Sequence, residues 1–182
     1  MRNFETDFRS FAQVSLGIED YNRVNDFVRE VISRKSGESH HQADGDREVE
    51  RWTTGILGEL AMERFLGSPF IDWSVGDSDD YDMADLAALN VAAGIKTVKR
   101  GQYPVVHKHP RRPEVILVRD GLTIHVCGLA SPEMMLRCSD DGLILNANLR
   151  ARGTKTGFWG FAELVPFDGL ADLQRLSWKM VF

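Results

Sequence analysis

Residues 81–106, YDMADLAALNVAAGIKTVKRGQYPVV, decide how the rest of the chain is interpreted. The segment begins with acidic residues and continues as an apolar run typical of a β-strand, which contains Lys96 with Gly94 two positions before it. Because side chains alternate across a strand, Lys96 is expected to project to the face opposite Ile95. An ammonium held on a rigid strand beside acidic residues is suited to stabilise charge on a phosphate.

Length and charge limit the class of protein. The 182 residues suffice for one sizeable core and are few for two, so residues 1–182 are expected to form a single domain. The net charge of −5 argues against a generally basic surface, although one face can still attract phosphate. No long apolar run occurs, and the N-terminus is charged where a signal peptide is apolar. We therefore expect a cytoplasmic protein with no membrane partner.

The hydrophobic pattern predicts an α/β (α+β) fold with a mixed central β-sheet flanked by helices. Helical periodicity predicts two N-terminal helices within about residues 20–66, and Gly67 and Pro69 end the second helix. Strand-like runs predict a sheet core within about residues 80–165, and a closing helix is predicted over about residues 169–180. The predicted strands are residues 89–98, 114–120, 122–130 and 157–164. Between them, residues 131–157 are read as a short helix followed by a flexible basic connection.

The second predicted helix carries two interior glycines and a carboxylate on its apolar side. Gly55 and Gly58 each cost roughly 1 kcal/mol relative to alanine, so a close approach to a neighbouring element is expected there. Glu59 lies three residues after Ile56, on the apolar side of the helix. A partly buried carboxylate requires a partner. The alternative is a surface ion pair with Arg64 or another surface cation.

An acidic segment precedes the strand that carries Lys96, and its charge must be neutralised by solvent or by a cation. An EF-hand is excluded, because counting from Asp77 puts Asp82 at the sixth position instead of glycine and Ala88 at the twelfth instead of glutamate. Mg²⁺ or Mn²⁺ remains, because one or two carboxylates with water and substrate phosphate can hold either ion. The aspartates are Asp72, Asp77, Asp79, Asp80, Asp82 and Asp85.

Three motifs in this order resemble the PD-(D/E)XK nuclease superfamily, in particular small phage and bacterial members. They are the helix GELAMERFLG with its glutamate, YD at positions 81 and 82, and GIKT at positions 94–97, with the strand-like GFWGFAEL downstream. The resemblance implies a restriction-endonuclease-like fold. It also implies a hydrolase that cuts DNA phosphodiester bonds, as an endonuclease or an exonuclease, with Mg²⁺ or Mn²⁺ as cofactor.

The resemblance assigns roles to three residues. Asp82 corresponds to the metal-binding aspartate, Lys96 to the catalytic lysine, and Glu59 to the helix glutamate that binds metal in many members. The departure is Gly94, where the family has aspartate or glutamate as a principal metal ligand. Another element would have to supply the missing carboxylate. The candidates are Glu59, Asp79, Asp80 and Asp85.

A basic segment follows the candidate catalytic strand and fits a DNA partner. A basic loop beside an acidic metal site suits a phosphodiester substrate, and Tyr103 is placed to stack on a base. The resemblance also allows a homodimer, because cutting two strands takes two sites. The basic candidates for DNA binding are Lys99, Arg100, Lys108, Arg111 and Arg112.

Two other functions remain open. In the first, the absent carboxylate at Gly94 leaves a catalytically inactive nucleic-acid-binding or assembly protein of the same fold. In the second, the chain is an acidic protein-interaction module whose aspartates form a solvated surface.

Single residues also have simpler interpretations. Lys96 could be a strand-edge lysine, and Gly94 could mark a β-bulge, which predicts irregular backbone there. Cys127 and Cys138 lack zinc-ligand spacing and are expected to be free thiols.

Overall fold

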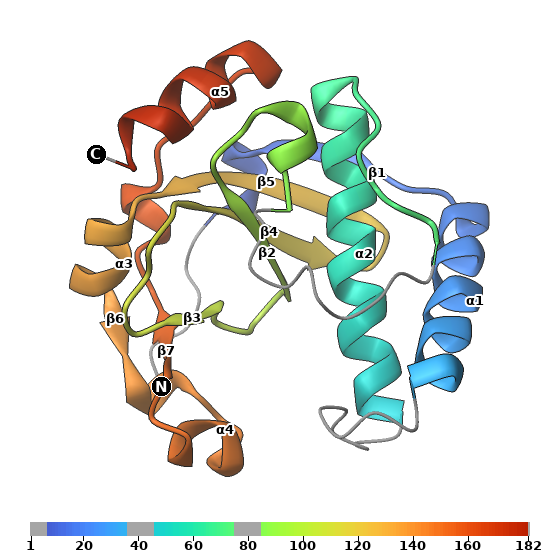
Figure 1. The fold of residues 1–182 in the computed structure, drawn as a ribbon, viewed down its shortest axis with the longest axis horizontal. Helices are drawn as coiled ribbons and strands as arrows, with labels where there is room; N and C mark the ends of the chain where they lie inside the picture. Colours follow the sequence, from blue (N-terminus) through green and yellow to red (C-terminus); the bar gives the residue numbers. More distant parts are fainter. Residues whose placement is uncertain (1–6, 36–45, 75–84, 182) are drawn as a thin grey trace.

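A four-stranded mixed sheet forms the centre of the fold in the computed structural model, which describes residues 7–35, 46–74 and 85–181 (Figure 1). Strand β2 runs parallel to β4, and β5 runs antiparallel to both β4 and β1. The predicted mixed sheet with flanking helices is therefore confirmed. In spatial order the strands are β1 (Ala12–Ser15), β5 (Thr123–Ala130), β4 (Glu114–Asp120) and β2 (Gly94–Lys99).

Three helices cover one face of this sheet. Both helices predicted near the N-terminus form, and the closing helix forms where its periodicity placed it. Their apolar stripes join inward side chains of β4 and β5 in one buried cluster. The helices are α1 (Ile18–Lys35), α2 (Asp46–Leu66) and α5 (Leu170–Lys179). Fully buried members of the cluster include Val24, Leu57, Leu117, Ile124 and Leu173.

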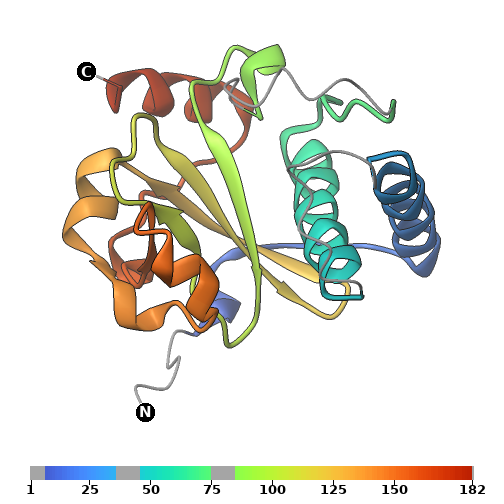
Figure 2. The same ribbon diagram turned by 60° about the horizontal axis from the view of Figure 1, so that its bottom comes forward.

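A smaller antiparallel sheet and short helices pack on the other face. Figure 2 shows α1 and α2 on one side of the central sheet and these elements on the other. Buried side chains such as Ile116, Val106 and Phe158 join the two sheets in a second cluster. The elements are β3 (Val105–His107), β7 (Lys155–Phe158), β6 (Ser139–Asp140), α3 (Pro132–Arg137) and α4 (Ala147–Ala151). Single 3₁₀ turns complete the described chain at Phe8–Ser10, Ala87–Leu89, Asp141–Leu143 and Phe161–Glu163.

Two local expectations are corrected. The strand predicted over residues 157–164 ends at Phe158, and a 3₁₀ turn follows it. The bulge expected at Gly94 is also wrong, because the β2–β4 register runs without a break. The irregularity lies in the β4–β5 pair, where the register shifts between Ile116 and Leu117 and Cys127 is the extra residue.

Several buried polar or reactive groups belong to the core. His125 and Cys127 are both buried on β5, as expected of neighbouring core residues. Cys127 and Cys138 are free thiols, as predicted, and burial raises the pKa of the Cys127 thiol to about 12. A thiol with so high a pKa is a poor nucleophile. Among the described helices, none is long and apolar enough to cross a membrane.

The two glycines of α2 have different surroundings. A Cβ added at Gly58 would lie 1.8 Å from Thr97 Oγ1 on β2, which is far inside contact distance. A Cβ at Gly55 would meet nothing within 4 Å. The predicted close approach is therefore confirmed at Gly58 and wrong at Gly55, and Gly58 is what lets α2 lie directly against β2.

This difference predicts opposite effects for the same substitution in one helix. Gly58→Ala should lower the free energy of unfolding by about 1–3 kcal/mol, because it overpacks the α2–β2 contact. Gly55→Ala should raise it by up to about 1 kcal/mol, because alanine favours the helix. Urea unfolding of both variants measures the difference, and equal effects at the two positions would contradict the packing described.

Candidate functional site

The carboxylate of Glu114 occupies the space that the side chain of residue 94 would fill. Gly94 and Glu114 lie opposite each other in the parallel β2–β4 pair. A Cβ at Gly94 would lie 2.3 Å from Glu114 Oε2 and 3.2 Å from Asp85 Oδ2. Two carboxylates thus converge where the nuclease pattern has its aspartate or glutamate. Because alternate strand residues share a face, Lys96 lies on the same face as position 94.

Glu114 is held without a full set of partners. It is 6% exposed, and its Oε2 atom is buried and accepts no hydrogen bond. Its nearest described cation at contact range is Arg112, whose Nε lies 4.0 Å from Oε1. Burial raises the pKa of Glu114, and the charges of Lys96 and Arg112 oppose that shift. A buried carboxylate oxygen of this kind is destabilising unless something binds it.

Asp85 is held by the backbone at the start of β2. Its Oδ2 atom accepts a hydrogen bond from the Ile95 amide at 2.6 Å. Of the four residues considered as replacements for the missing carboxylate, Asp85 is thus brought to position 94, whereas Asp79 and Asp80 lie outside the described residues. Asp82, the residue assigned as the metal-binding aspartate, also lies outside them.

Glu59 joins this group from α2. It is partly buried, and its pKa is raised to about 7 by burial and then by the negative charges of Asp85 and Glu63, with Lys96 opposing. The alternative ion pair with Arg64 is not formed, because Arg64 binds Asp20 of α1 at 2.5 Å. Its position one residue after Gly58 places Glu59 where α2 meets β2.

Lys96 lies among these carboxylates and neutralises none of them directly. Within the described ranges its ammonium forms no hydrogen bond or ion pair, although its charge acts on Glu59 and Glu114. A lysine that only protected the strand edge would point into solvent. Partial burial of Lys96 and its influence on two carboxylates fit a charge kept for a ligand.

The donor atoms suit a hard divalent cation. Asp85 and Glu114 supply carboxylate oxygens, which Mg²⁺ and Mn²⁺ prefer, and the unpaired Oε2 atom of Glu114 can accept a cation. Among residues 7–35, 46–74 and 85–181, however, no three Asp, Glu, His or Cys side chains are close enough together to form a metal site. A complete ligand set therefore needs water, substrate oxygens or a group outside these ranges.

The six residues proposed to bind DNA have different surroundings. Lys99 binds Glu50 at 2.7 Å, Lys108 binds Asp141 at 2.5 Å, and Arg112 lies beside Glu114. Tyr103 packs against the second core cluster, and Arg111 is exposed.

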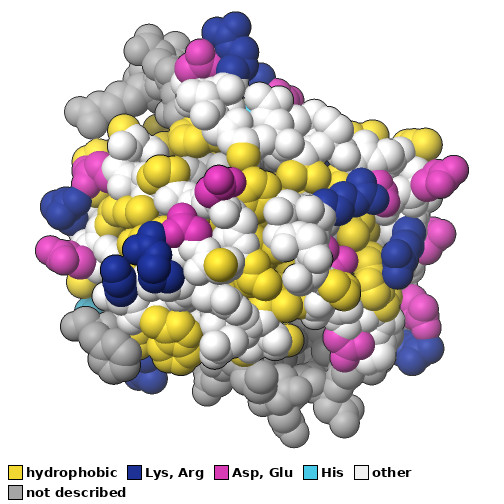
Figure 3. All heavy atoms as spheres, turned by 90° about the horizontal axis from the view of Figure 1, so that it is seen from above, with side chains coloured by type: hydrophobic (Ala, Val, Ile, Leu, Met, Phe, Trp, Pro, Cys, Tyr) yellow, Lys and Arg dark blue, Asp and Glu magenta, His cyan; other side chains and the backbone are white. Residues whose placement is uncertain are grey.

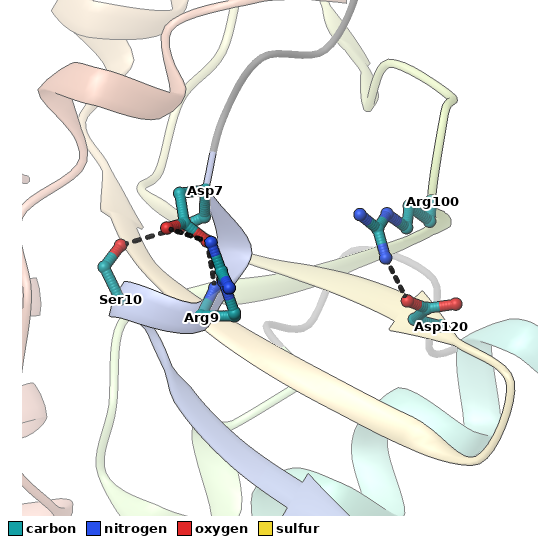
Figure 4. Close-up of polar contacts among 5 residues, drawn as sticks. All are labelled: Asp7, Arg9, Ser10, Arg100 and Asp120. Carbon is teal, nitrogen blue, oxygen red and sulfur yellow. Dashed lines mark hydrogen bonds and ion pairs between the residues drawn. The ribbon is translucent and has the colours of Figure 1, made fainter.

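Arg100, the sixth, binds Asp120 at 2.5 Å at the far end of β4. In Figure 4, Arg100 turns toward Asp120, while Asp7 is held by Arg9 and Ser10. Surface ion pairs of this kind contribute little stability and open readily to a competing phosphate.

On the face in Figure 3, acidic and basic side chains are interspersed among hydrophobic ones, so its described residues form no uniform basic field.

Sequence reasoning did not name Glu114, Lys155 or His107 as site residues. Glu114 carried a usable signal, since it is the one acidic residue at the start of the otherwise apolar run PEVILV. Lys155 and His107 pair across β7 and β3. Their contact could not be predicted, because the two residues lie 48 positions apart in the sequence, on short strands.

Comparison with known proteins adds no assignment. No family model matches the chain, and no curated protein or solved structure is significantly similar to it. The likeness to PD-(D/E)XK nucleases therefore stays a prediction, and function has to be inferred from the site itself.

The raised pKa of Glu59 predicts a pH-dependent contribution to stability. The folded protein binds the Glu59 proton more tightly than the unfolded chain does, whose pKa is near 4.5. This stabilisation is complete below pH 4.5 and is lost as the pH rises through about 7. Over that window, wild type should lose about 1–3 kcal/mol relative to Glu59→Gln, since one pKa unit corresponds to about 1.4 kcal/mol.

Urea unfolding of wild type and Glu59→Gln between pH 4 and pH 8 measures this difference. The exposed Glu133→Gln on α3 serves as the control and should follow wild type. Parallel curves for wild type and Glu59→Gln would show that Glu59 titrates normally.

Proposed function

We propose that this protein is a divalent-metal-dependent nuclease that hydrolyses DNA phosphodiester bonds. The observation that carries the proposal is the Glu114 carboxylate in the space beside Gly94, on the face that bears Lys96. Glu114 thereby supplies, beside Lys96, the carboxylate that is missing at Gly94 of the GIKT motif. A restriction-endonuclease-like fold belongs to the same proposal.

The carboxylates of Glu114 and Asp85 would hold Mg²⁺ or Mn²⁺, with Glu59 and Asp82 as further candidates. Bound there, the cation would lower the pKa of a coordinated water and offset charge on the phosphate. Without a cation the pKa of Glu59 is raised to about 7, and a divalent cation beside it would lower that pKa and favour the carboxylate form that binds metal.

Lys96 would touch the scissile phosphate. Its ammonium has no partner at contact distance among the described residues, so no ion pair within them has to break when substrate binds. Rigid attachment to β2 keeps the charge where negative charge develops on the phosphate oxygens.

Cleavage of labelled single-stranded, duplex and branched DNA tests the proposal. Wild type should cut at least one substrate with Mg²⁺ or Mn²⁺ and none with EDTA. Lys96→Ala and Glu114→Gln should each reduce the rate by at least about 100-fold, as expected when a group that stabilises transition-state charge is removed. Asp82→Ala tests the metal aspartate that the resemblance assigned.

The matched controls make the same substitutions at exposed residues away from the site. Lys179→Ala on α5 and Glu133→Gln on α3 should cut at the wild-type rate. DNA binding that ignores Mg²⁺, without cleavage of any substrate by folded wild type, would support the inactive nucleic-acid-binding protein instead. Absence of both binding and cleavage would favour the acidic interaction module.

A further inference from the structure

A lysine and a histidine of the small sheet meet beside the candidate site. His107 on β3 and Lys155 on β7 lie opposite each other in the antiparallel ladder, so their side chains share a face. Lys155 Nζ is in hydrogen-bonding contact with His107 Nε2. With Nε2 as acceptor, the ring is neutral and its Nδ1–H and the remaining ammonium hydrogens stay available to a ligand.

Charges of the candidate site shift the pKa values of the same two residues. The pKa of Lys155 is lowered to about 8 by burial and then by Lys96, with Glu114 opposing. The pKa of His107 is lowered by burial and then by Lys155, Lys96 and Arg112. Lys96 of β2 and Lys155 of β7 therefore lie near the buried Glu114 carboxylate, and His107 of β3 lies near both lysines.

Neither Lys155 nor His107 contacts a carboxylate among the described residues. Within the described ranges Lys155 forms no ion pair with a carboxylate, whereas the neighbouring Lys108 is paired with Asp141. Half-buried like charges repel each other and raise the free energy of the free protein. A bound anion would relieve that repulsion and accept the open hydrogen bonds.

We propose that Lys155 and His107, together with Lys96, form an oxyanion-binding subsite that holds a phosphate group of a phosphodiester chain beside Glu114. That the phosphate belongs to a nucleic acid rests on the proposed function. The cation cluster itself does not, because it stands on the contacts of Lys155 and His107. The subsite is distinct from the carboxylates, so it should bind without a metal ion.

NMR titration of the full chain in EDTA at constant ionic strength tests the subsite. The probes are a thymidine dinucleotide with one phosphodiester, inorganic phosphate, and chloride as the reference anion. The dinucleotide should shift the ring resonances of His107, and Lys155→Ala should weaken its binding roughly tenfold, as loss of a charged hydrogen bond implies. Lys155→Arg, which keeps the charge, should retain most of the affinity.

Lys179→Ala is the matched control, because it removes an exposed lysine of α5, which packs on the other face of the central sheet, and it should bind like wild type. Equal weakening in Lys155→Ala and Lys179→Ala would overturn the subsite. Binding of inorganic phosphate but not of the dinucleotide would overturn the phosphodiester assignment, and no binding of either would overturn the proposal. Dinucleotide binding that depends on Lys155, in a protein that cuts no DNA, would uphold the subsite and reject only the nuclease.

Discussion

The parallel pairing of β2 with β4 is the constraint on which the site depends. That register sets Gly94 opposite Glu114, and the absence of a side chain on Gly94 leaves room for the Glu114 carboxylate. Lys96 follows two residues later on the same face. A shift by one residue would turn Glu114 toward the helices and bury its charge in the apolar cluster.

Contacts between α2 and the same two strands hold Glu59 at this place. Gly58 lets α2 lie against Thr97, and Arg119 of β4 donates to both Glu50 and Thr54 of α2 at 2.9 Å. These contacts fix the helix against β2 and β4 without using the residues of the candidate site. Glu59, next to Gly58, is therefore carried to the edge of the sheet where Asp85 and Lys96 lie.

The sequence revealed the elements whose periodicity is strong. The run EVILVRD forms β4 at its predicted bounds, and the amphipathic pattern of residues 21–34 lies within α1. Strand β1 was missed because four mostly exposed residues give no apolar alternation. The placement of Glu114 opposite Gly94 could not be predicted, because β3 and a basic loop separate β2 from β4, and nothing in the sequence specifies the register of two strands so far apart. Lys96 and Glu59 were named from short motifs and lie near each other in the structure, whereas the basic residues named with them are mostly paired with carboxylates.

Moving the carboxylate back to position 94 tests most directly whether Glu114 replaces the missing acidic residue. Glu114→Ala should abolish metal-dependent DNA cleavage and also vacate the space over Gly94. The double variant Gly94→Asp with Glu114→Ala should then recover cleavage, because the new carboxylate enters that space. Gly94→Asp alone should cleave more slowly than wild type, because its side chain collides with Glu114. The account would be contradicted if the double variant folds but remains as inactive as Glu114→Ala while the wild type is active.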